Sequence, residues 1–245
     1  MKRFLLSFAL SAVLLLASQV HASADLQNTG GVLQYYDQNG SQASEIGIDV
    51  SYYNNQIDWH ALKAQGFDFA IIRLGGRGWG TGRLYGDRMT QSYLRGARDA
   101  GIRIGAYFYS TARNPAEATE EAQAALYELN GIPLELPVFI DMETSGDYPN
   151  GRSDTLTPAE RASVIEVFCR TVASAGYQTG LYASEGYCRF DLDYEAVKQF
   201  PLWLASYTVD NRLPQYIDGY VLWQQTDSAY AGGIDGPFDL DLILR

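Results

Sequence analysis

The stretch Pro137-Val-Phe-Ile-Asp-Met-Glu143 is the part of the chain around which the rest can be placed. Its apolar residues 138–140 form a short continuous run, which is typical of a strand buried on both faces. Side chains two residues apart on a strand point to the same side, so Asp141 and Glu143 leave this strand facing one spot. Like charges held so close cannot both ionise freely, and one carboxyl is therefore expected to keep its proton to higher pH.

A neutral acid beside a carboxylate is the pair that cleavage of a glycosidic bond requires. A strand that runs into a solvated acidic loop gives the same Asp-x-Glu pattern, so the motif alone does not establish catalysis. The rest of the chain has to decide between these two interpretations.

Short strands alternate with helices from Glu45 onward. Helix starts are indicated at Asn114-Pro115-Ala116-Glu117 and at Thr157-Pro158-Ala159-Glu160, where a capping residue precedes a proline and an acid. The predicted strands cover residues 47–51, 69–73, 103–109, 137–143, 178–183, 201–207, 220–225 and 238–244, and the predicted helices cover residues 58–66, 88–100, 114–130 and 157–176. This pattern predicts an α/β fold, an irregular TIM-like (β/α) barrel with reduced helices in the C-terminal half. An open doubly wound sheet is the alternative, but no glycine-rich phosphate loop follows the first strand.

Acidic residues recur at the ends of the predicted strands. Asp49 ends the first strand, Asp141 and Glu143 end the fourth, and Asp239 and Asp241 lie on the eighth. In a parallel barrel the C-terminal strand ends share one face, the first and eighth strands are neighbours, and the fourth lies across the mouth. We therefore expect these carboxylates to lie close together at one rim of the barrel. Repulsion between like charges destabilises such a cluster, so a functional role explains it better than a structural one.

Aromatic residues lie on the same strand ends. Aromatic rings beside polar groups suit sugars, which have apolar faces and a rim of hydroxyl groups. The candidates are Tyr107, Tyr109, Tyr182, Trp203, Tyr207 and Trp223, although each one singly can also be core packing. Arg73 on the second strand either orients a substrate or, as we prefer, is a buried counter-ion for an acid such as Asp49.

The first residues predict export. Two basic residues precede an apolar run over residues 4–17, and small residues after it offer sites for signal peptidase. We therefore expect a signal peptide over residues 1–22, a polar extended leader over residues 23–44 and a catalytic barrel domain over residues 45–245. The mature protein is then periplasmic or extracellular and has no membrane anchor, whereas an uncleaved N-terminal anchor is the alternative.

The composition excludes several function classes. The net charge of −11 becomes −13 without the signal peptide, so nucleic acid is not an expected partner. His60 is the one histidine left after signal removal, and it lies in no nucleophile motif. Ser-His-Asp or Cys-His catalysis and zinc sites built from several His or Cys ligands are therefore not expected.

The two cysteines, Cys169 and Cys188, both lie in the exported part. An even number and an oxidising destination slightly favour a disulfide between them. Cys169 also falls on the apolar side of the helix predicted over residues 157–176, so a buried free thiol is the competing interpretation.

The order of these blocks resembles glycoside hydrolase family 25, the Chalaropsis-type lysozymes, which are N-acetylmuramidases. The matching blocks are residues 47–51, 57–59, 69–73, 105–107, 137–143, 180–183, 203–207, 223–224 and 233–239. They follow the family's order and span the whole predicted domain. Agreement of so many blocks is harder to obtain by chance than a single Asp-x-Glu motif.

The resemblance implies a barrel that hydrolyses the β-1,4 bond between N-acetylmuramic acid and N-acetylglucosamine in the glycan strand of peptidoglycan. It implies that Glu143 is the general acid, that Asp49, Asp141 and Asp239 are the other active-site acids, and that Gln224 binds substrate. Retention of configuration can follow two routes: an aspartate attacks the sugar, or, as we prefer, the substrate's own N-acetyl group attacks while Asp141 orients it. We expect no metal or organic cofactor, and we expect a monomer.

Three positions depart from the family pattern. Tyr52 and Phe108 stand where many relatives have His, and Asp241 stands where Asn is usual. These differences concern the surroundings of the matched acids rather than the acids themselves. Two other functions stay open: a chitinase-like enzyme that cuts N-acetylglucosamine polymers, and a non-catalytic glycan-binding module on the same fold.

Overall fold

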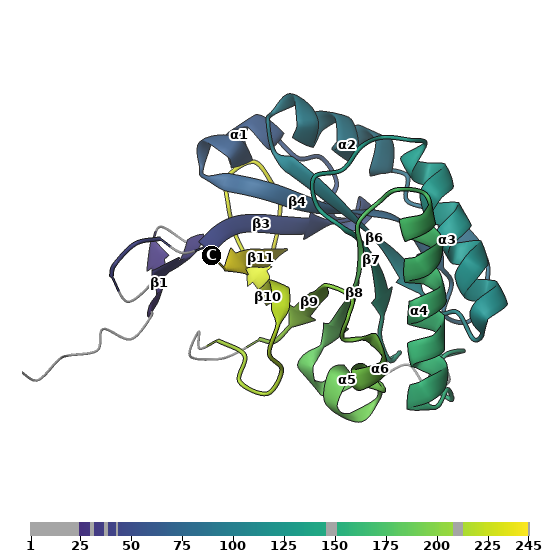
Figure 1. The fold of residues 1–245 in the computed structure, drawn as a ribbon. Coiled ribbons are helices and arrows are strands. Elements are labelled where there is room, and N and C mark those ends of the chain that lie inside the picture. Colours follow the sequence, from purple (N-terminus) through teal and green to yellow (C-terminus); the bar gives the residue numbers. More distant parts are fainter. Residues whose placement is uncertain are drawn as a thin grey trace, which may run out of the picture.

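The computed structural model describes residues 25–29, 32–36, 39–42, 44–145, 151–207 and 213–244, and the predicted signal peptide lies outside them. Within this part of the chain the barrel strands are β3 (Ser44–Val50), β4 (Phe67–Arg77), β6 (Arg103–Ser110), β7 (Val138–Met142), β8 (Thr179–Ser184), β9 (Leu202–Ala205), β10 (Tyr220–Ala229) and β11 (Phe238–Leu244). β3 pairs with both β4 and β11, so the sheet closes on itself (Figure 1). The predicted TIM-like barrel is confirmed, and the open doubly wound sheet is wrong.

Among the described strands of the barrel, β11 runs against its neighbours. The successive pairs from β3 to β10 are parallel, whereas β11 is antiparallel to both β10 and β3. The expectation of an all-parallel barrel is therefore wrong for this strand. The short connection over residues 230–237 explains the difference, because a parallel crossover needs about a dozen residues or more and a hairpin does not.

Helices cover the outside of the first half of the barrel (Figure 1). They are α1 (Trp59–Ala64), α2 (Thr90–Asp99), α3 (Pro115–Leu129) and α4 (Pro158–Ser174), followed after β8 by the short α5 (Glu185–Phe190) and α6 (Tyr194–Val197). The predicted helix starts are confirmed, since Asn114 accepts from the Glu117 N–H and Thr157 forms a capping box with Glu160. The described residues after α6 contain no further helix, as the sequence predicts, and no described helix is long and apolar enough to cross a membrane.

The interior of the barrel is filled below its mouth. Phe69, Ile71, Phe139, Trp203 and Leu222 belong to one buried cluster of side chains from different barrel strands. Alternate positions on the same strands face outward and pack under the helices, which follows from the period of two along a strand. Because the interior is packed with side chains, a substrate has to meet the barrel at a rim.

The segment before the barrel is more ordered than the sequence predicts. β1 (Asp25–Thr29) and β2 (Val32–Tyr36) pair as an antiparallel hairpin. The Tyr35 N–H donates to the Ser44 Oγ at 3.0 Å, which ties the hairpin to the start of β3. The expectation of an extended leader is therefore wrong here. The Gly30-Gly31 pair in the sequence is typical of a hairpin turn, whereas the prediction of a leader followed the polar composition of the segment.

Both cysteines are buried free thiols. Cys169 on α4 directs its Sγ toward the backbone of β8, where it donates to the Gly180 carbonyl at 3.5 Å, and Cys188 is carried separately by α5. The slightly favoured disulfide is therefore wrong for this structure, and the competing interpretation holds. Burial raises the pKa of each thiol to about 12, so neither is a reactive thiolate at neutral pH.

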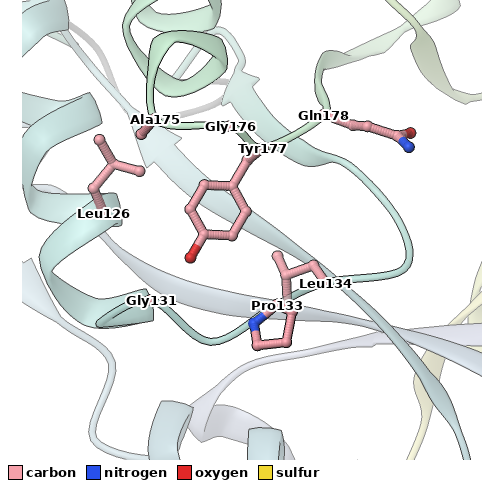
Figure 2. A pocket seen from close by; sticks show the side chains of 8 residues that line it. All are labelled: Leu126, Gly131, Pro133, Leu134, Ala175, Gly176, Tyr177 and Gln178. Carbon is pink, nitrogen blue, oxygen red and sulfur yellow. The ribbon is translucent and has the colours of Figure 1, made fainter.

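A hollow of about 510 Å³ opens at the N-terminal ends of β7 and β8, where α3 and α4 end (Figure 2). Its lining residues are Leu126, Gly131, Pro133, Leu134, Ala175, Gly176, Tyr177 and Gln178, none of which is charged. The Tyr177 hydroxyl donates to the Ile132 carbonyl at 3.0 Å and joins the two loops that form the hollow. This lining offers no carboxylate for catalysis, so the candidate site has to be sought at the other rim.

Candidate active site

The predicted acids lie at the rim formed by the C-terminal ends of the parallel strands. Asp49 and Asp239 are direct partners across the β3–β11 pair. Because β11 is antiparallel, Asp239 near its start reaches the rim at which β3 ends. Asp141 lies near the end of β7, and Glu143 directly follows that strand. The carboxyl groups are close enough to perturb one another's titration, so the structure brings all four together.

Burial and mutual repulsion raise the pKa of the acids in this cluster. For Asp49 burial is the largest cause, and the charges of Asp239 and Asp241 add to it. Burial raises the pKa of Asp239 to about 6, with the charge of Asp227 as the next cause. The rim therefore keeps protons at pH values at which exposed carboxyl groups have lost theirs.

The carboxyl groups of Asp141 and Glu143 share a hydrogen bond, which requires a proton between them. Burial raises the pKa of both groups, and the charge of Glu143 raises that of Asp141 further, so the proton belongs to Asp141 in the free protein. Asp141 is 6% exposed, whereas Glu143 reaches the rim, where part of its side chain is exposed although neighbouring atoms crowd its carboxyl group. The buried Asp141 Oδ1 atom has no hydrogen-bond partner among the described residues.

A single amide connects two tyrosines to Asp49. The hydroxyl groups of Tyr182 and Tyr207 both donate to the Gln224 Oε1, at 2.8 and 2.7 Å. The other end of the amide, Nε2, donates to the Asp49 Oδ2 at 2.7 Å. Both tyrosine donors face the same oxygen, so the Gln224 amide is held in one orientation and Asp49 receives a fixed donor.

A cleft of about 390 Å³ opens directly beside Glu143. It is lined by Glu143, Tyr182, Ser184, Glu185, Gly186, Ala205, Ser206 and Tyr207. Of the two tyrosines in this lining, Tyr207 is 51% exposed and Tyr182 is buried. The volume is sufficient for a small ligand group beside the carboxyl pair.

The other predicted substrate-binding side chains have different places. Tyr109 is half-buried on β6 and lies near Asp141 and Glu143, so it belongs to the mouth. Tyr107 is 8% exposed and lies below it, with its ring packed edge-on against Trp203 at 5.8 Å.

Trp203 and Gln224 are buried, and the contacts that the structure gives them are with other protein side chains. Trp203 is 1% exposed, and its ring is enclosed by Tyr107, Phe139 and Tyr182. Gln224 is 4% exposed, and its amide is fully used by the two tyrosines and Asp49. Trp203 thus lies in the floor below the mouth and Gln224 holds Asp49 by a hydrogen bond, and substrate binding by these two side chains stays a prediction. Trp223 is likewise core, since its Nε1 donates to the Ser206 carbonyl at 2.9 Å.

Arg73 does not neutralise Asp49. Its Nε donates to the Asp87 Oδ2 at 2.8 Å, and Asp87 also accepts from the backbone N–H groups of Tyr52 and Met89. The predicted pairing of Arg73 with Asp49 is therefore wrong: the partner is Asp87, which follows β5 (Leu84–Gly86), a strand that the sequence pattern did not indicate. Asp49 is left with no ion pair among the described residues, which agrees with its raised pKa.

Sequence reasoning missed an aromatic wall on one side of the mouth. Tyr52 and Tyr53 stack with ring centroids 4.1 Å apart, and the Arg73 guanidinium lies 4.9 and 5.4 Å from those centroids. Tyr85 from β5 (Leu84–Gly86) lies over Gly76, where an added Cβ would be 2.5 Å from the Tyr85 hydroxyl oxygen. The available signals were the Tyr-Tyr pair after the first strand and the paired glycines after the second.

The described residues contain no group of three or more His, Cys, Asp or Glu side chains arranged to hold a metal ion. The titratable groups at this rim are carboxyl groups: the Asp141–Glu143 pair beside the cleft, and Asp49 and Asp239 on the paired strands β3 and β11 across the mouth. A carboxyl pair of this kind can exchange a proton with a bound ligand.

Comparison with known proteins adds a family. Residues 48–234 match the model of Glycosyl hydrolases family 25. The chain is 29% identical to the autolytic lysozyme of Clostridium acetobutylicum over 195 residues, which are 80% of this chain and 54% of that protein. It is 27% identical to lysozyme M1 of Streptomyces globisporus over 204 residues, 79% of this chain and 65% of that protein. The chain therefore spans between half and two thirds of these relatives.

The fold is also found in solved structures. The modular autolysin LytC from Streptococcus pneumoniae, solved in complex with a synthetic peptidoglycan ligand, superposes with a TM-score of 0.72 at 23% sequence identity. The match covers 89% of this chain and 52% of that one. At this identity the comparison supports the same barrel architecture.

Proposed function

Because the chain belongs to Glycosyl hydrolases family 25, we propose that it is an exported, lysozyme-type enzyme that cleaves peptidoglycan between N-acetylmuramic acid and N-acetylglucosamine. The relatives from Clostridium and Streptomyces are lysozymes, and the autolysin from Streptococcus was solved with a peptidoglycan ligand. The observation that carries the proposal is the Asp141–Glu143 carboxyl pair, which shares a proton beside an open cleft.

The proposed reaction begins with a proton transfer inside this pair. In the free protein the proton belongs to Asp141 and Glu143 faces solvent. A sugar in the cleft removes water from Glu143, which disfavours its charge, while an acetamido N–H that donates to the unpaired Asp141 Oδ1 favours the charge on Asp141. The proton then moves to Glu143, which delivers it to the leaving oxygen of the glycosidic bond.

The same contact favours one of the two routes to retention. A charged Asp141 that accepts from the acetamido N–H orients the N-acetyl oxygen for attack on the anomeric carbon. Asp49 is held from below by Gln224 and has a raised pKa, so it is poorly suited to be a free attacking carboxylate. We therefore assign Asp141 to orientation of the N-acetyl group, and Asp49 and Asp239 to stabilisation of the positive charge that develops on the sugar.

The decisive experiment replaces the acid without changing its size. We expect Glu143→Gln to lower kcat on purified peptidoglycan by about 10³-fold, in the range known for general acids, while glycan binding and the folded state are kept. Glu195→Gln is the matched control, because the Glu195 side chain is 78% exposed and pairs with Lys198 on the surface. A Glu143→Gln variant as active as the control would discard the assignment.

The products identify the bond. Mass spectrometry of the released fragments should show N-acetylmuramic acid at the new reducing end, and chitin should not be degraded. Release from chitin with intact peptidoglycan would establish the chitinase-like alternative. Binding of glycan strands with no hydrolysis of either polymer would establish the non-catalytic module.

Export is supported by the residues before the barrel. Two basic residues and the apolar run over residues 4–17 have the form of a signal peptide, and they lie outside the described residues. We expect expression of the full chain in a bacterium to yield a mature protein that begins within a few residues after Ala22. N-terminal sequencing of the periplasmic and extracellular fractions tests this, and a protein that keeps its first residues would contradict it.

A further inference from the structure

Asp241 is a fully buried carboxyl group that the proposed reaction does not use. It lies on β11 two residues after Asp239, with 0% of its surface exposed. Its Oδ1 accepts from the Trp203 Nε1 at 2.8 Å. Its Oδ2 has no hydrogen-bond donor among the described residues. A buried carboxyl oxygen without a donor is costly when it is charged, and a proton of its own removes that cost.

The group that faces Asp241 is Asp49. Asp49 is opposite Asp239 in the β3–β11 pair, and side chains two apart on one strand share a face, so Asp241 and Asp49 lie on the same inner face of adjacent strands. They are close enough to form a hydrogen bond with each other once one of the two carboxyl groups holds a proton. The Asp49 Oδ2 already accepts from Gln224, and a hydrogen bond between two carboxyl groups needs one proton.

We propose that Asp241 is a positioning residue: it shares one proton with Asp49, and this shared proton, together with the Gln224 amide, fixes the Asp49 carboxyl in its orientation toward the sugar. The inference rests on the proposed function, in which Asp49 stabilises the charge on the sugar. In this arrangement Asp49 and Asp241 form a second carboxyl pair below the Asp141–Glu143 pair. The proton of Asp241 donates to Asp49, as the amide N–H of an asparagine at this position could.

The charged and titratable groups around this pair are defined. Asp239 from β11 adds negative charge beside both Asp49 and Asp241, and Asp141 from β7 adds to it at Asp49 when its own carboxyl group is charged. Tyr107, Tyr182 and Tyr207, from β6, β8 and the end of β9, face the same space, and burial raises the pKa of each well above that of an exposed tyrosine. Arg73 on β4 is paired with Asp87. Protons lost below about pH 9 in this space therefore come from carboxyl groups.

The first test does not use activity. The full chain is labelled with ¹³C at the aspartate carboxyl carbons, and the wild type, Asp241→Asn and Asp99→Asn are titrated by NMR. Asp99 is an exposed aspartate at the end of α2, so its replacement removes one aspartate carboxyl group, as Asp241→Asn does, without touching the mouth. We expect the number of aspartate carboxyl groups still protonated at pH 7 to fall by one in Asp241→Asn and to stay unchanged in Asp99→Asn. An unchanged number in Asp241→Asn would overturn the proposal.

The second test separates positioning from packing. Asp241→Ala removes both hydrogen bonds, and we expect kcat on peptidoglycan to fall at least tenfold with KM within twofold, whereas Asp241→Asn restores most of kcat because its amide donates to Asp49. The asparagine variant should also lack the alkaline loss of kcat that follows deprotonation of Asp241. Equal kcat in the alanine variant and the wild type, or equal pH profiles in Asp241→Asn and the wild type, would overturn the proposal. A wild type that cleaves no peptidoglycan overturns the proposed function instead, and the NMR count still decides whether the proton is shared.

Discussion

The two ends of the barrel are built from the same strands, but one carries buried acidic residues and the other does not. At the C-terminal ends, Asp49 and Asp141 are buried, crowded by other acids and have raised pKa values. At the N-terminal ends, the hollow of Figure 2 is lined by uncharged side chains, and Tyr177 has its hydroxyl satisfied. The repulsion among these carboxyl groups therefore acts at the rim of the proposed site. Packing and hydrogen bonds in the interior and at the other rim stabilise the fold.

This comparison has a thermodynamic side. A carboxyl group whose pKa is raised on folding is one whose charged form the folded state disfavours, so each such acid lowers stability at neutral pH. Replacing an acid at the mouth should therefore stabilise the protein and inactivate it. Replacing a residue at the hollow should lower the stability of the protein and leave its activity unchanged.

The largest effect is expected for Asp49→Asn. Removal of this charge should lower kcat on peptidoglycan about 10²- to 10³-fold, because the developing positive charge on the sugar loses a partner. The melting temperature should rise, since the repulsion between Asp49 and Asp239 is gone and the asparagine amide can still accept from Gln224 and donate to Asp241. Kinetics and thermal unfolding of the same preparation measure both, with Asp99→Asn as the control. A variant that loses activity and also loses stability would show that the repulsion at this rim is not a cost to the fold.

A smaller effect is expected from Asp239, and it depends on pH. Burial raises the pKa of Asp239 to about 6, so its contribution to stability is full below the pKa of the unfolded chain, near pH 4, and is lost as the pH rises through 6. Asp239→Asn lacks this loss. Its free energy of unfolding should therefore exceed that of the wild type by an amount that grows between pH 4 and pH 7, to about 1–2 kcal/mol after allowance for solvent screening.

Urea unfolding at several pH values measures this difference. The matched control is Asp235→Asn, a change at an exposed aspartate in the same connection between β10 and β11. A difference between Asp239→Asn and the wild type that stays constant from pH 4 to pH 7 would contradict the assigned cause.

Much of the barrel could be predicted because it depends on short-range patterns. A continuous apolar run such as residues 138–140 is typical of a strand that is covered on both faces. The capping residues Asn114 and Thr157 mark the starts of helices from local sequence alone. The direction of β11 could not be predicted from its composition, because a strand reads the same whichever way it runs. The length of the loop before it was the usable signal.

The clustering of the acids could be predicted from the sequence because the C-terminal ends of parallel strands lie at one rim. Asp239 reaches the same rim even though β11 runs in the opposite direction. What the sequence could not supply was the partner of each polar group. Arg73 binds Asp87 rather than Asp49, and Gln224 holds Asp49, because such pairings depend on side-chain directions across strands that are far apart along the chain. The burial of Trp203 likewise depends on the three rings that enclose it.

The smallest effect is expected at the N-terminal ends of the barrel strands, in the hollow of Figure 2. Tyr177→Phe removes the hydroxyl that donates to the Ile132 carbonyl and leaves the ring in the hollow, so the free energy of unfolding should fall by about 0.5–1.5 kcal/mol while kcat is unchanged. Tyr127→Phe is the matched control, because Tyr127 on α3 is 81% exposed and should tolerate the change. Urea unfolding and turnover of peptidoglycan measure both quantities. A Tyr177→Phe variant with lowered kcat would mean that the two ends of the barrel are coupled, since the altered atom lies at the rim opposite to every acid of the proposed site.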